Sequence, residues 1–348
     1  MNVLNPCHLL VPAIPEEVSR PLWSVMIPTY NCANYLRETL ASVLAQDPGP
    51  DLMQIEVIDD HSTKDDPKSV VEELGRGRVG FYQQPENIGY IRNFETCLLR
   101  SRGHLVHLLH GDDYVRDGFY QKIQQAFASA PEIGYAFCRH IYMDEQGHWQ
   151  SISPLEQSGS GIIKKWLEKI AAGQRLATPS VVVRREVYEQ LGGFDRRFTC
   201  AGEDWEMWVR IATRYPVWFE TEPLAAYRVQ RKGSLTSNAK RAGVASDMRL
   251  ATEIVELYLH EYIATSLAKK TTKMARQMYA SWAVEAMEGI PLLKEPRFFY
   301  WQVIEVFRCS CSWKTLQLVI LVIWKRVNFL WSSTFEKLFI RIQRDLAK

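Results

Sequence analysis

Short apolar runs alternate with segments of helical periodicity over residues 21 to about 130, and this alternation constrains the fold more than any other feature of the chain. Strand-like apolar runs lie at residues 23–27, 54–58, 79–83 and 105–109. Segments with helix-spaced apolar residues lie between them, at residues 34–46, 67–74 and 89–100. Because strand–helix–strand units with short loops cross over with a single hand, the pattern predicts an α/β fold with a mostly parallel sheet flanked by helices.

The pattern changes twice further along the chain. We expect a helix at 162–172, a strand at 180–183, helices at 186–191 and 203–215, and strands at 217–219 and 225–229. After about residue 240 the strand pattern ends, and residues 245–310 show amphipathic helical spacing with a break at 289–291. The sequence therefore predicts three parts, namely an N-terminal arm (1–20), an α/β domain (21–240) and an α-helical C-terminal region (241–348).

The composition excludes several classes of protein. Hydrophobic residues make up 47% of the chain and charged residues 24%, which is ordinary for a folded domain and unlike a disordered or polytopic membrane protein. The 42 basic and 40 acidic residues give a net charge of +2, so no basic field indicates nucleic-acid binding. The seven cysteines are few and irregularly spaced, and the N-terminus has no basic start followed by an apolar core. Both features predict reduced thiols in a cytoplasmic protein.

The C-terminal tail combines positive charge with aromatic residues. Residues 312–348 contain seven Lys or Arg and two acidic residues, a net charge of +5. The apolar run 318–324 is only seven residues long, whereas a membrane-spanning helix needs about 20. The tail is typical of a helix that lies on an anionic membrane surface as a peripheral contact. The alternative is a terminal helix that packs on the domain with solvated lysines.

Paired carboxylates follow two of the predicted strands. Asp59 and Asp60 end the second strand, and Asp112 and Asp113 follow the fourth. Ligands of open parallel sheets bind beyond the carboxyl ends of the strands, where clustered carboxylates repel each other unless a cation intervenes. Mg²⁺ or Mn²⁺ and a hydroxyl-rich ligand are the natural partners, and a nucleotide-diphosphate sugar supplies both ribose hydroxyls and a pyrophosphate–metal unit. The alternative is that each pair only caps the following helix.

Two other sequence patterns resemble binding sites, but their positions relative to the predicted strands and helices argue against both. Gly75, Gly77 and Gly80 match the spacing of a dinucleotide-binding loop, but they follow a predicted helix and enter a strand. His104, His107 and His110 lie on or beside one predicted strand. Alternate strand residues face opposite sides of a sheet, so we do not expect a three-histidine metal site.

Several motifs occur together in order along the chain. They are VMIPTYN at 25–31, LASVLAQ at 40–46, EVIDDHST at 56–63, NIG at 87–89, RN at 92–93, LHGDD at 109–113, GGFD at 192–195 and GEDWEMW at 202–208. In this order they resemble family 2 glycosyltransferases of the GT-A fold, over residues 22 to about 236. The resemblance implies a Rossmann-like, mostly parallel GT-A sheet and an inverting displacement at the anomeric carbon of a nucleotide-sugar donor.

The resemblance also assigns roles by position. Pro28, Tyr30 and Asp60 are implied to contact the base and ribose of the donor, and Asn87, Gly89, Arg92 and Asn93 to line its pocket. Asp112 and Asp113 fall at the site that holds ribose and the divalent metal, where the family's first aspartate is replaced by His110. Asp204 matches the catalytic base, with Glu203 beside it.

Two further features of this region need interpretation. We expect the helix dipole at residue 203 to lower the pKa of the base Asp204. Trp205 and Trp208 either pack in the core or stack on an acceptor sugar. Many family members carry a histidine where this chain has Gln230, so a metal ligand from that loop is not expected.

The function expected from these residues is metal-dependent transfer of a sugar from a nucleotide-diphosphate donor to a saccharide or lipid-linked saccharide, in cell-surface polysaccharide synthesis. A metal-dependent nucleotidyltransferase is one alternative, although residues 28–31 offer no Gly- and Lys-rich phosphate loop. A non-catalytic nucleotide-sugar-binding protein on the same fold is the other alternative, suggested by His110 and Gln230.

Overall fold

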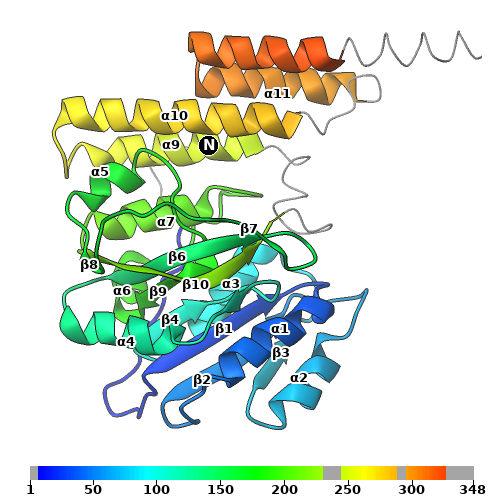
Figure 1. The fold of residues 1–348 in the computed structure, drawn as a ribbon, viewed down its shortest axis with the longest axis vertical. Coiled ribbons are helices and arrows are strands. Elements are labelled where there is room, and N and C mark those ends of the chain that lie inside the picture. Colours follow the sequence, from blue (N-terminus) through cyan, green and yellow to red (C-terminus); the bar gives the residue numbers. More distant parts are fainter. Residues whose placement is uncertain (1–6, 230–243, 288–294, 327–348) are drawn as a thin grey trace, which may run out of the picture.

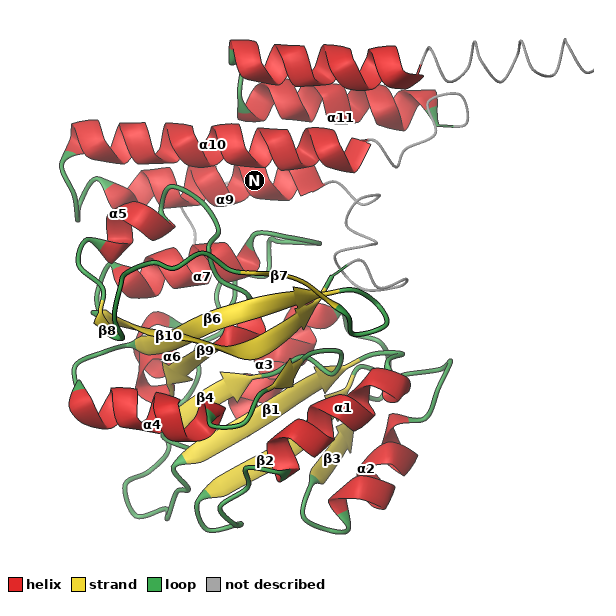
Figure 2. Cartoon of the chain, viewed as in Figure 1, coloured by secondary structure: helices red, strands yellow, loops and turns green. Residues whose placement is uncertain are grey.

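The computed structural model describes residues 7–229, 244–287 and 295–326. A mixed sheet occupies the lower half of the view in Figure 1, with helices on both faces, and the C-terminal helices stack above it. Figure 2 shows the same division, because the strands gather in one body and the upper layers are entirely helical. The predicted α/β fold with a mostly parallel sheet is confirmed.

The sheet brings the functional strand ends to one edge. Its strands are β1 (Trp23–Thr29), β2 (Met53–Asp59), β3 (Gly80–Gln83), β4 (Leu105–Leu108), β5 (Tyr114–Val115), β6 (Tyr135–Met143), β7 (Trp149–Ile152), β8 (Gly161–Ile162), β9 (Val181–Arg184) and β10 (Val217–Arg228). They follow the order β3-β2-β1-β4-β9-β6-β10-β5, with β7 beside β6 and β8 beside β10. β1 pairs in parallel with β2 and β4, so the carboxyl ends of these three strands point the same way.

Helices cover both faces of this sheet. They are α1 (Ala33–Leu44), α2 (Pro67–Gly75), α3 (Tyr90–Arg100), α4 (Phe119–Ser129), α5 (Trp166–Ile170), α6 (Arg185–Leu191), α7 (Glu203–Ala212), α9 (Val244–Leu259), α10 (Thr265–Met287) and α11 (Pro296–Cys309). Alternation along β1 sends Val25 and Ile27 into a core with α1, α2 and α4. Met26 joins the opposite core with α3, α6 and α7, which continues into the C-terminal helices.

Several elements differ from those expected. α4 and β6 form where no element was expected, and the expected helix at 162–172 is strand β8 followed by the short helix α5. Lys165, with φ 54°, has a left-handed backbone conformation that separates the strand from the helix. The two expected strands at 217–219 and 225–229 are one strand, β10, whose register with β6 shifts on either side of Pro223. Proline has no backbone N–H to donate to a neighbouring strand, so the sequence predicted a gap between two strands. The sheet instead continues through Pro223 with a local shift in register.

The C-terminal helices pack on the α/β domain. α9 lies against α7 and α10 lies against α5, while α11 packs on α9 and α10. A further helix covers residues 313–326. None of the helices in the described ranges combines the length and apolar character that a membrane crossing demands. Residues 327–348 of the predicted basic tail lie outside the described residues.

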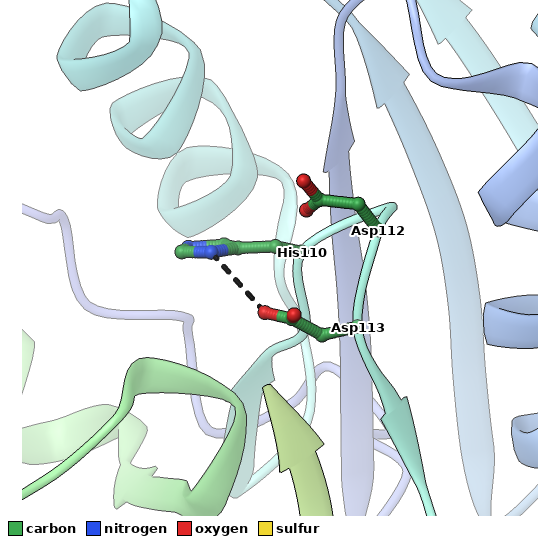
Figure 3. A group of neighbouring side chains, drawn as sticks. All are labelled: His110, Asp112 and Asp113. Carbon is green, nitrogen blue, oxygen red and sulfur yellow. Dashed lines mark ion pairs between the residues drawn. The ribbon is translucent and has the colours of Figure 1, made fainter. Parts of the chain in front are cut away.

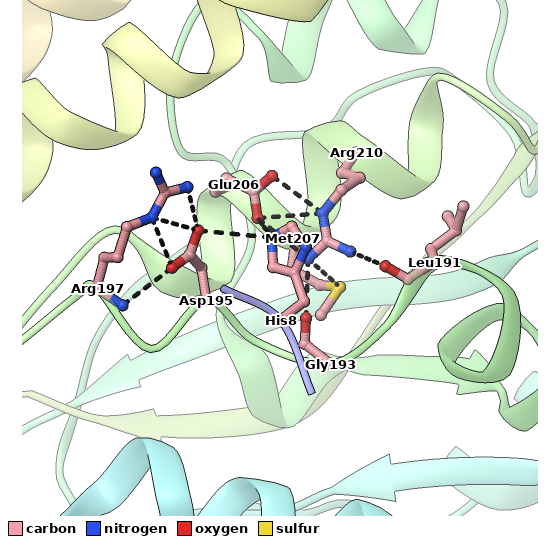
Figure 4. A network of polar contacts seen from close by, with 8 residues as sticks. All are labelled: His8, Leu191, Gly193, Asp195, Arg197, Glu206, Met207 and Arg210. Atoms are coloured by element: carbon pink, nitrogen blue, oxygen red, sulfur yellow. Dashed lines mark hydrogen bonds and ion pairs between the residues drawn. The ribbon is translucent and has the colours of Figure 1, made fainter. Parts of the chain in front are cut away.

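The described part of the N-terminal arm is fastened to the segment before α7 (Figure 4). Leu9 accepts a hydrogen bond from the backbone N–H of Gly193 at 2.8 Å. The His8 imidazole lies 3.5 Å from a carboxylate oxygen of Asp195 and 3.9 Å from one of Glu206. The arm therefore helps to fix α7, the helix that carries the predicted base.

Candidate functional site

The ends of β1 and β2 form one wall of the site. Pro28 is buried in β1 opposite Ile58 of β2, and Tyr30 follows β1 with its side chain 43% exposed. The backbone N–H of Asp60 donates to the carbonyl of Thr29 at 2.9 Å, which joins the two strand ends. The predicted base- and ribose-binding residues thus lie on adjacent strands at one edge of the sheet.

Asp60 organises the segment before α3. Its two carboxylate oxygens accept hydrogen bonds from the backbone N–H groups of Ile88 at 2.9 Å and Gly89 at 3.1 Å. The amide of Asn87 donates to the carbonyl of Asp60 at 3.0 Å. Burial raises the pKa of Asp60, and the two backbone hydrogen bonds oppose that rise. The structure therefore brings Asp60, Asn87 and Gly89 into direct contact.

The other two residues of this segment, Arg92 and Asn93, are placed differently. Arg92 is exposed in the first turn of α3. Asn93 is buried, donates to the carbonyl of Ile58 at 2.9 Å and accepts from the side chain of Gln84 at 3.1 Å. Asn93 thus holds α3 against the sheet, whereas Arg92 faces solvent.

Three potential metal ligands gather after β4 (Figure 3). One ligand atom each of His110, Asp112 and Asp113 lie within 4.8 Å of one another. His110 Nδ1 is 3.7 Å from a carboxylate oxygen of Asp113. The other oxygen of Asp113 accepts a hydrogen bond from the backbone N–H of Arg228 at 2.8 Å, which fixes the cluster to the end of β10.

These three side chains are suitable ligands for a divalent cation. Two carboxylates and an imidazole are ligands that Mn²⁺ accepts, and Mg²⁺ is satisfied by the carboxylates alone. Burial lowers the pKa of His110, which favours the neutral imidazole that can bind a metal. The histidine that departs from the family pattern therefore belongs to the same cluster as the two aspartates.

Asp204, the predicted catalytic base, lies at the beginning of α7. Glu203 and Asp204 are its first residues, preceded by Gly202 with φ 90°. Asp204 accepts a hydrogen bond from the side-chain amide of Gln174 at 2.7 Å, and Glu203 accepts one from the hydroxyl of Tyr90 at 3.2 Å. These two carboxylates are therefore held by different elements, the loop after α5 and the start of α3.

The electrostatics of this pair differ from the expectation. Burial raises the pKa of both Glu203 and Asp204, so the helix dipole does not dominate as predicted. Trp205 and Trp208 are buried, and the indole N–H of Trp205 donates to the carbonyl of Ile170 at 2.7 Å. The core interpretation of both tryptophans is confirmed.

Helix α3 joins the parts of the site. Tyr90, the residue after Gly89, contacts Glu203 through its hydroxyl and Phe94 through an edge-to-face ring contact at 5.5 Å. Phe94 in turn stacks on His110 with ring centroids 5.2 Å apart. The first two turns of α3 thus link the segment 87–93, here called the donor segment, with the metal-ligand cluster and with Glu203, the neighbour of the predicted base Asp204.

Sequence reasoning missed Tyr90, Phe94 and Gln174. The first two are aromatic residues four positions apart, which lie on one face of a helix, and this spacing was the available signal. No local pattern marks Gln174, because its role depends on the packing of the loop after α5 against α7.

The model of Glycosyl transferase family 2 matches residues 24–192. Residues 24–192 of this chain therefore belong to glycosyl transferase family 2. The match spans β1 to the end of α6, so it includes the strand ends, the donor segment and the metal-ligand cluster of this glycosyltransferase.

Related sequences are consistent with this family. A Mycobacterium tuberculosis protein is 27% identical over 249 residues, which cover 68% of the glycosyltransferase and 76% of that protein. The O-antigen biosynthesis protein RfbC of Myxococcus xanthus is 24% identical over 212 residues, which cover 55% of this chain and 16% of RfbC. The chain therefore corresponds to a small part of RfbC.

Solved structures establish the GT-A fold of the glycosyltransferase. Residues 1–349 of Staphylococcus aureus TarS superpose with a TM-score of 0.61 at 14% identity, covering 85% of this chain and 83% of that one. The mannosyltransferase PcManGT of Pyrobaculum calidifontis, in complex with GDP-Man and Mn²⁺, superposes with a TM-score of 0.50 at 20% identity, covering 93% and 91%.

Proposed function

We propose that this chain transfers a sugar from a nucleotide-diphosphate donor to a hydroxyl of a saccharide or lipid-linked saccharide, with inversion at the anomeric carbon. The observation that carries the proposal is the convergence on α3 of the donor segment, the metal-ligand cluster and the Glu203 carboxylate, which lies next to Asp204 on α7. Complexes of the neighbours support a nucleotide-sugar donor, since TarS binds UDP-GlcNAc and PcManGT binds GDP-Man with Mn²⁺.

The donor occupies the edge formed by β1, β2 and the start of α3. Tyr30 and Pro28 at the end of β1 contact the base, and Asp60 shapes the pocket by holding the backbone at residues 88–89. Asn87 and Gly89 line the pocket, Asn93 keeps α3 in place, and the exposed Arg92 can reach the donor phosphates.

A divalent ion, Mg²⁺ or Mn²⁺, would be held by Asp112 and Asp113 together with His110. When bound, such an ion supplies Lewis-acid stabilisation of the charge that develops on the leaving nucleoside diphosphate. The hydrogen bond from the backbone N–H of Arg228 orients the Asp113 carboxylate for this purpose.

Asp204 acts as the general base. The acceptor oxygen forms a bond to the anomeric carbon, the bond from that carbon to the phosphate oxygen breaks with its electron pair, and the acceptor proton passes to the Asp204 carboxylate. General-base catalysis contributes about 10²–10⁴-fold, through a transition state with oxocarbenium character. Burial raises the pKa of Asp204, which brings the base closer to neutrality, where proton uptake is efficient.

The acceptor is presented at a membrane surface. The helix 313–326 exposes Trp313 to 72% and Trp324 to 61%, and Lys325 and Arg326 follow directly. Exposed aromatic rings beside basic residues are suited to the interface of an anionic membrane. The similarity to RfbC, an O-antigen biosynthesis protein, supports a place in cell-surface polysaccharide synthesis. The three-part division at residues 1–20, 21–240 and 241–348 is part of this proposal.

A donor panel tests the function. The purified chain is incubated with UDP-, GDP- and dTDP-sugars, Mn²⁺ and oligosaccharide acceptors, and the released nucleotide is identified. Sugar-dependent release of nucleoside diphosphate supports the proposal. Release of pyrophosphate would indicate a nucleotidyltransferase instead, and tight binding of a nucleotide sugar with no turnover would indicate a non-catalytic binding protein.

A further inference from the structure

Two loops contact or precede the start of α7. Both loops form hydrogen bonds with the C-terminal helices. One loop, residues 171–174, follows α5, and the other, residues 199–202, precedes α7. Helices α9 and α10 lie beyond residues 24–192, which match the family model. Their contacts with both loops connect this part of the chain to Asp204.

Helix α10 reaches Asp204 through Gln174. The side-chain amide of Gln174 donates to Asp204 at 2.7 Å, and its backbone N–H donates to the hydroxyl of Tyr279 on α10 at 3.0 Å. The preceding residue, Gly173, has φ 146°, and a Cβ there would lie 2.2 Å from the end of the Met278 side chain. The loop therefore packs against the end of the Met278 side chain of α10, and its positive φ at residue 173 favours glycine.

Helix α9 holds the other loop through one buried carboxylate. A single oxygen of Asp247 accepts hydrogen bonds from the backbone N–H groups of Thr199 and Cys200, both at 2.7 Å, and of Ala201 at 3.3 Å. It also accepts from the hydroxyl of Thr199 at 3.1 Å. The next residue, Gly202, is the N-cap of α7, so Asp247 fixes the chain immediately before Glu203 and Asp204.

The two attachments place the base from both sides. We infer that helices α9 and α10 position the Asp204 carboxylate in the active site. Tyr279 acts through Gln174, and Asp247 acts through the loop 199–201. This inference rests on the proposed role of Asp204 as general base, and it makes Gln174, Tyr279 and Asp247 positioning residues rather than catalytic ones.

Packing alone does not require the contact between Gln174 and Asp204. The ring of Trp205 already fills the space between α7 and α10 with an edge-to-face contact to Tyr279 at 5.1 Å. The amide of Gln174 instead ends on a carboxylate oxygen, where its donated hydrogen bond stabilises the ionised form of Asp204 and orients it. Loss of that bond should therefore change both the geometry and the protonation of the base.

The charged and titratable groups near the base are few. Glu203 lies beside Asp204 on α7, and Tyr279 faces Asp204 from α10. Tyr90 of α3 and Asp247 of α9 face Glu203. Besides Gln174, the donors to Asp204 are the side chain of Thr178 and the backbone N–H groups of Trp205 and of Asp204 itself. A shift in the pH profile after substitution of Gln174 would thus report on its own hydrogen bond.

The test compares full-length variants in the transfer assay. Tyr279→Phe removes the hydroxyl that holds the loop and keeps the ring, and Gln174→Leu removes the donor to Asp204. Tyr300→Phe, at a tyrosine 67% exposed on α11, is the matched control. We expect kcat to fall by about tenfold in both test variants with the donor KM within about twofold of wild type, because misplaced catalytic groups cost rate rather than donor binding. In Gln174→Leu, the acid limb of the kcat profile should move to higher pH.

The outcomes separate this inference from the proposed function. If both test variants keep the wild-type kcat and pH profile while Asp204→Asn abolishes transfer, the positioning role is wrong and the proposed base stands. If Asp204→Asn retains transfer, the base assignment and this inference fail together. Should Tyr279→Phe lower the melting temperature below the assay temperature, Gln174→Leu decides, since its side chain lies on a partly exposed loop.

Discussion

At the residue scale, the site depends on how the surroundings of each titratable side chain set its protonation state. His110, Asp112 and Asp113 can act together because burial keeps the imidazole neutral beside two carboxylates. His107, three residues earlier on β4, serves the core instead. Its ring lies 2.9 Å from the carbonyl of Pro179 and 3.2 Å from the hydroxyl of Tyr120. Two histidines of one strand segment thus have different tasks.

Removing a metal-ligand carboxylate should weaken metal-dependent donor binding. We expect Asp112→Asn and Asp113→Asn each to lower the affinity for a nucleoside diphosphate in Mn²⁺ by at least about tenfold, because a ligand charge is lost from the cluster. Isothermal titration calorimetry measures this, with Asp51→Asn at an exposed carboxylate as the control. Unchanged affinity in both variants would remove the metal site from the account.

The buried His107 should make stability depend on pH. Burial lowers its pKa to about 4 from 6.5. The unfolded chain therefore binds the extra proton first, and the free energy of unfolding should fall by about 3 kcal/mol as pH drops from 6.5 to 4. His107→Gln should reduce the dependence of the free energy of unfolding on pH between 6.5 and 4, as measured by urea unfolding. Part of that dependence should remain, because burial also lowers the pKa of His140 to about 4. The exposed control His148→Gln should leave the slope unchanged, and an equal slope in His107→Gln would contradict the assignment.

The sequence placed residues that follow a local rule and missed those that depend on packing. Asp60, Asp112 and Asp113 could be found because polar residues at the ends of parallel strands share one edge. Tyr90 and Gln174 could not be assigned, because their partners Glu203 and Asp204 are distant in the chain and meet only when α3 and the loop after α5 pack on α7.

At the element scale, the same distinction holds. β1, β2 and β4 carry the short apolar runs of buried parallel strands, and the sequence predicts them closely. β6 contains Arg139 and β10 contains Pro223, which obscure their strand pattern. These two strands are stabilised by their long mutual register, a tertiary property that no local window contains.

The junction between the N-terminal arm and α7 should contribute measurable stability. Asp195 is fully buried and pairs with Arg197, whose hydrogen bonds outweigh burial and lower the Asp195 pKa. Asp195→Asn removes the buried carboxylate that pairs with this guanidinium and should lower the free energy of unfolding by about 3 kcal/mol at pH 7. Because the pKa is lowered, the difference from wild type should disappear as pH falls below 3.8.

A surface ion pair provides the control for this measurement. Glu73→Gln breaks the exposed pair with Arg37 and should cost less than about 1 kcal/mol. Urea unfolding of both variants decides the matter. If Asp195→Asn is no more destabilising than Glu73→Gln, the buried pair of Asp195 and Arg197 does not stabilise this junction.

At the scale of the whole molecule, the described C-terminal helices form an inner pair, α9 and α10, and an outer pair, α11 and the helix 313–326. α9 and α10 contact the loops around Asp204, while α11 and the helix 313–326 lie further from the sheet (Figure 1). The outer pair exposes large apolar side chains, among them Trp301, Ile304, Trp313, Ile320, Leu321, Ile323 and Trp324. An exposed apolar surface of this kind beside basic residues suits contact with a membrane.

Membrane contact should depend on the exposed tryptophans of the last described helix. The double variant Trp313→Ser/Trp324→Ser should lose most co-sedimentation with anionic phosphatidylglycerol vesicles, since both rings face solvent. Trp149→Ser removes a tryptophan 53% exposed on β7 and should bind like wild type. Equal sedimentation of the double variant and wild type, or no binding by the full chain, would refute the membrane contact.

The measurement that tests the central claim most directly compares wild type with Asp204→Asn, using the donor that the panel identifies. Steady-state release of nucleoside diphosphate gives kcat, and calorimetry in Mn²⁺ gives the donor Kd. The account predicts that kcat falls by at least about 10²-fold, because the acceptor hydroxyl loses its base, while Kd changes by less than about threefold. A variant that turns over at close to the wild-type rate would contradict the account.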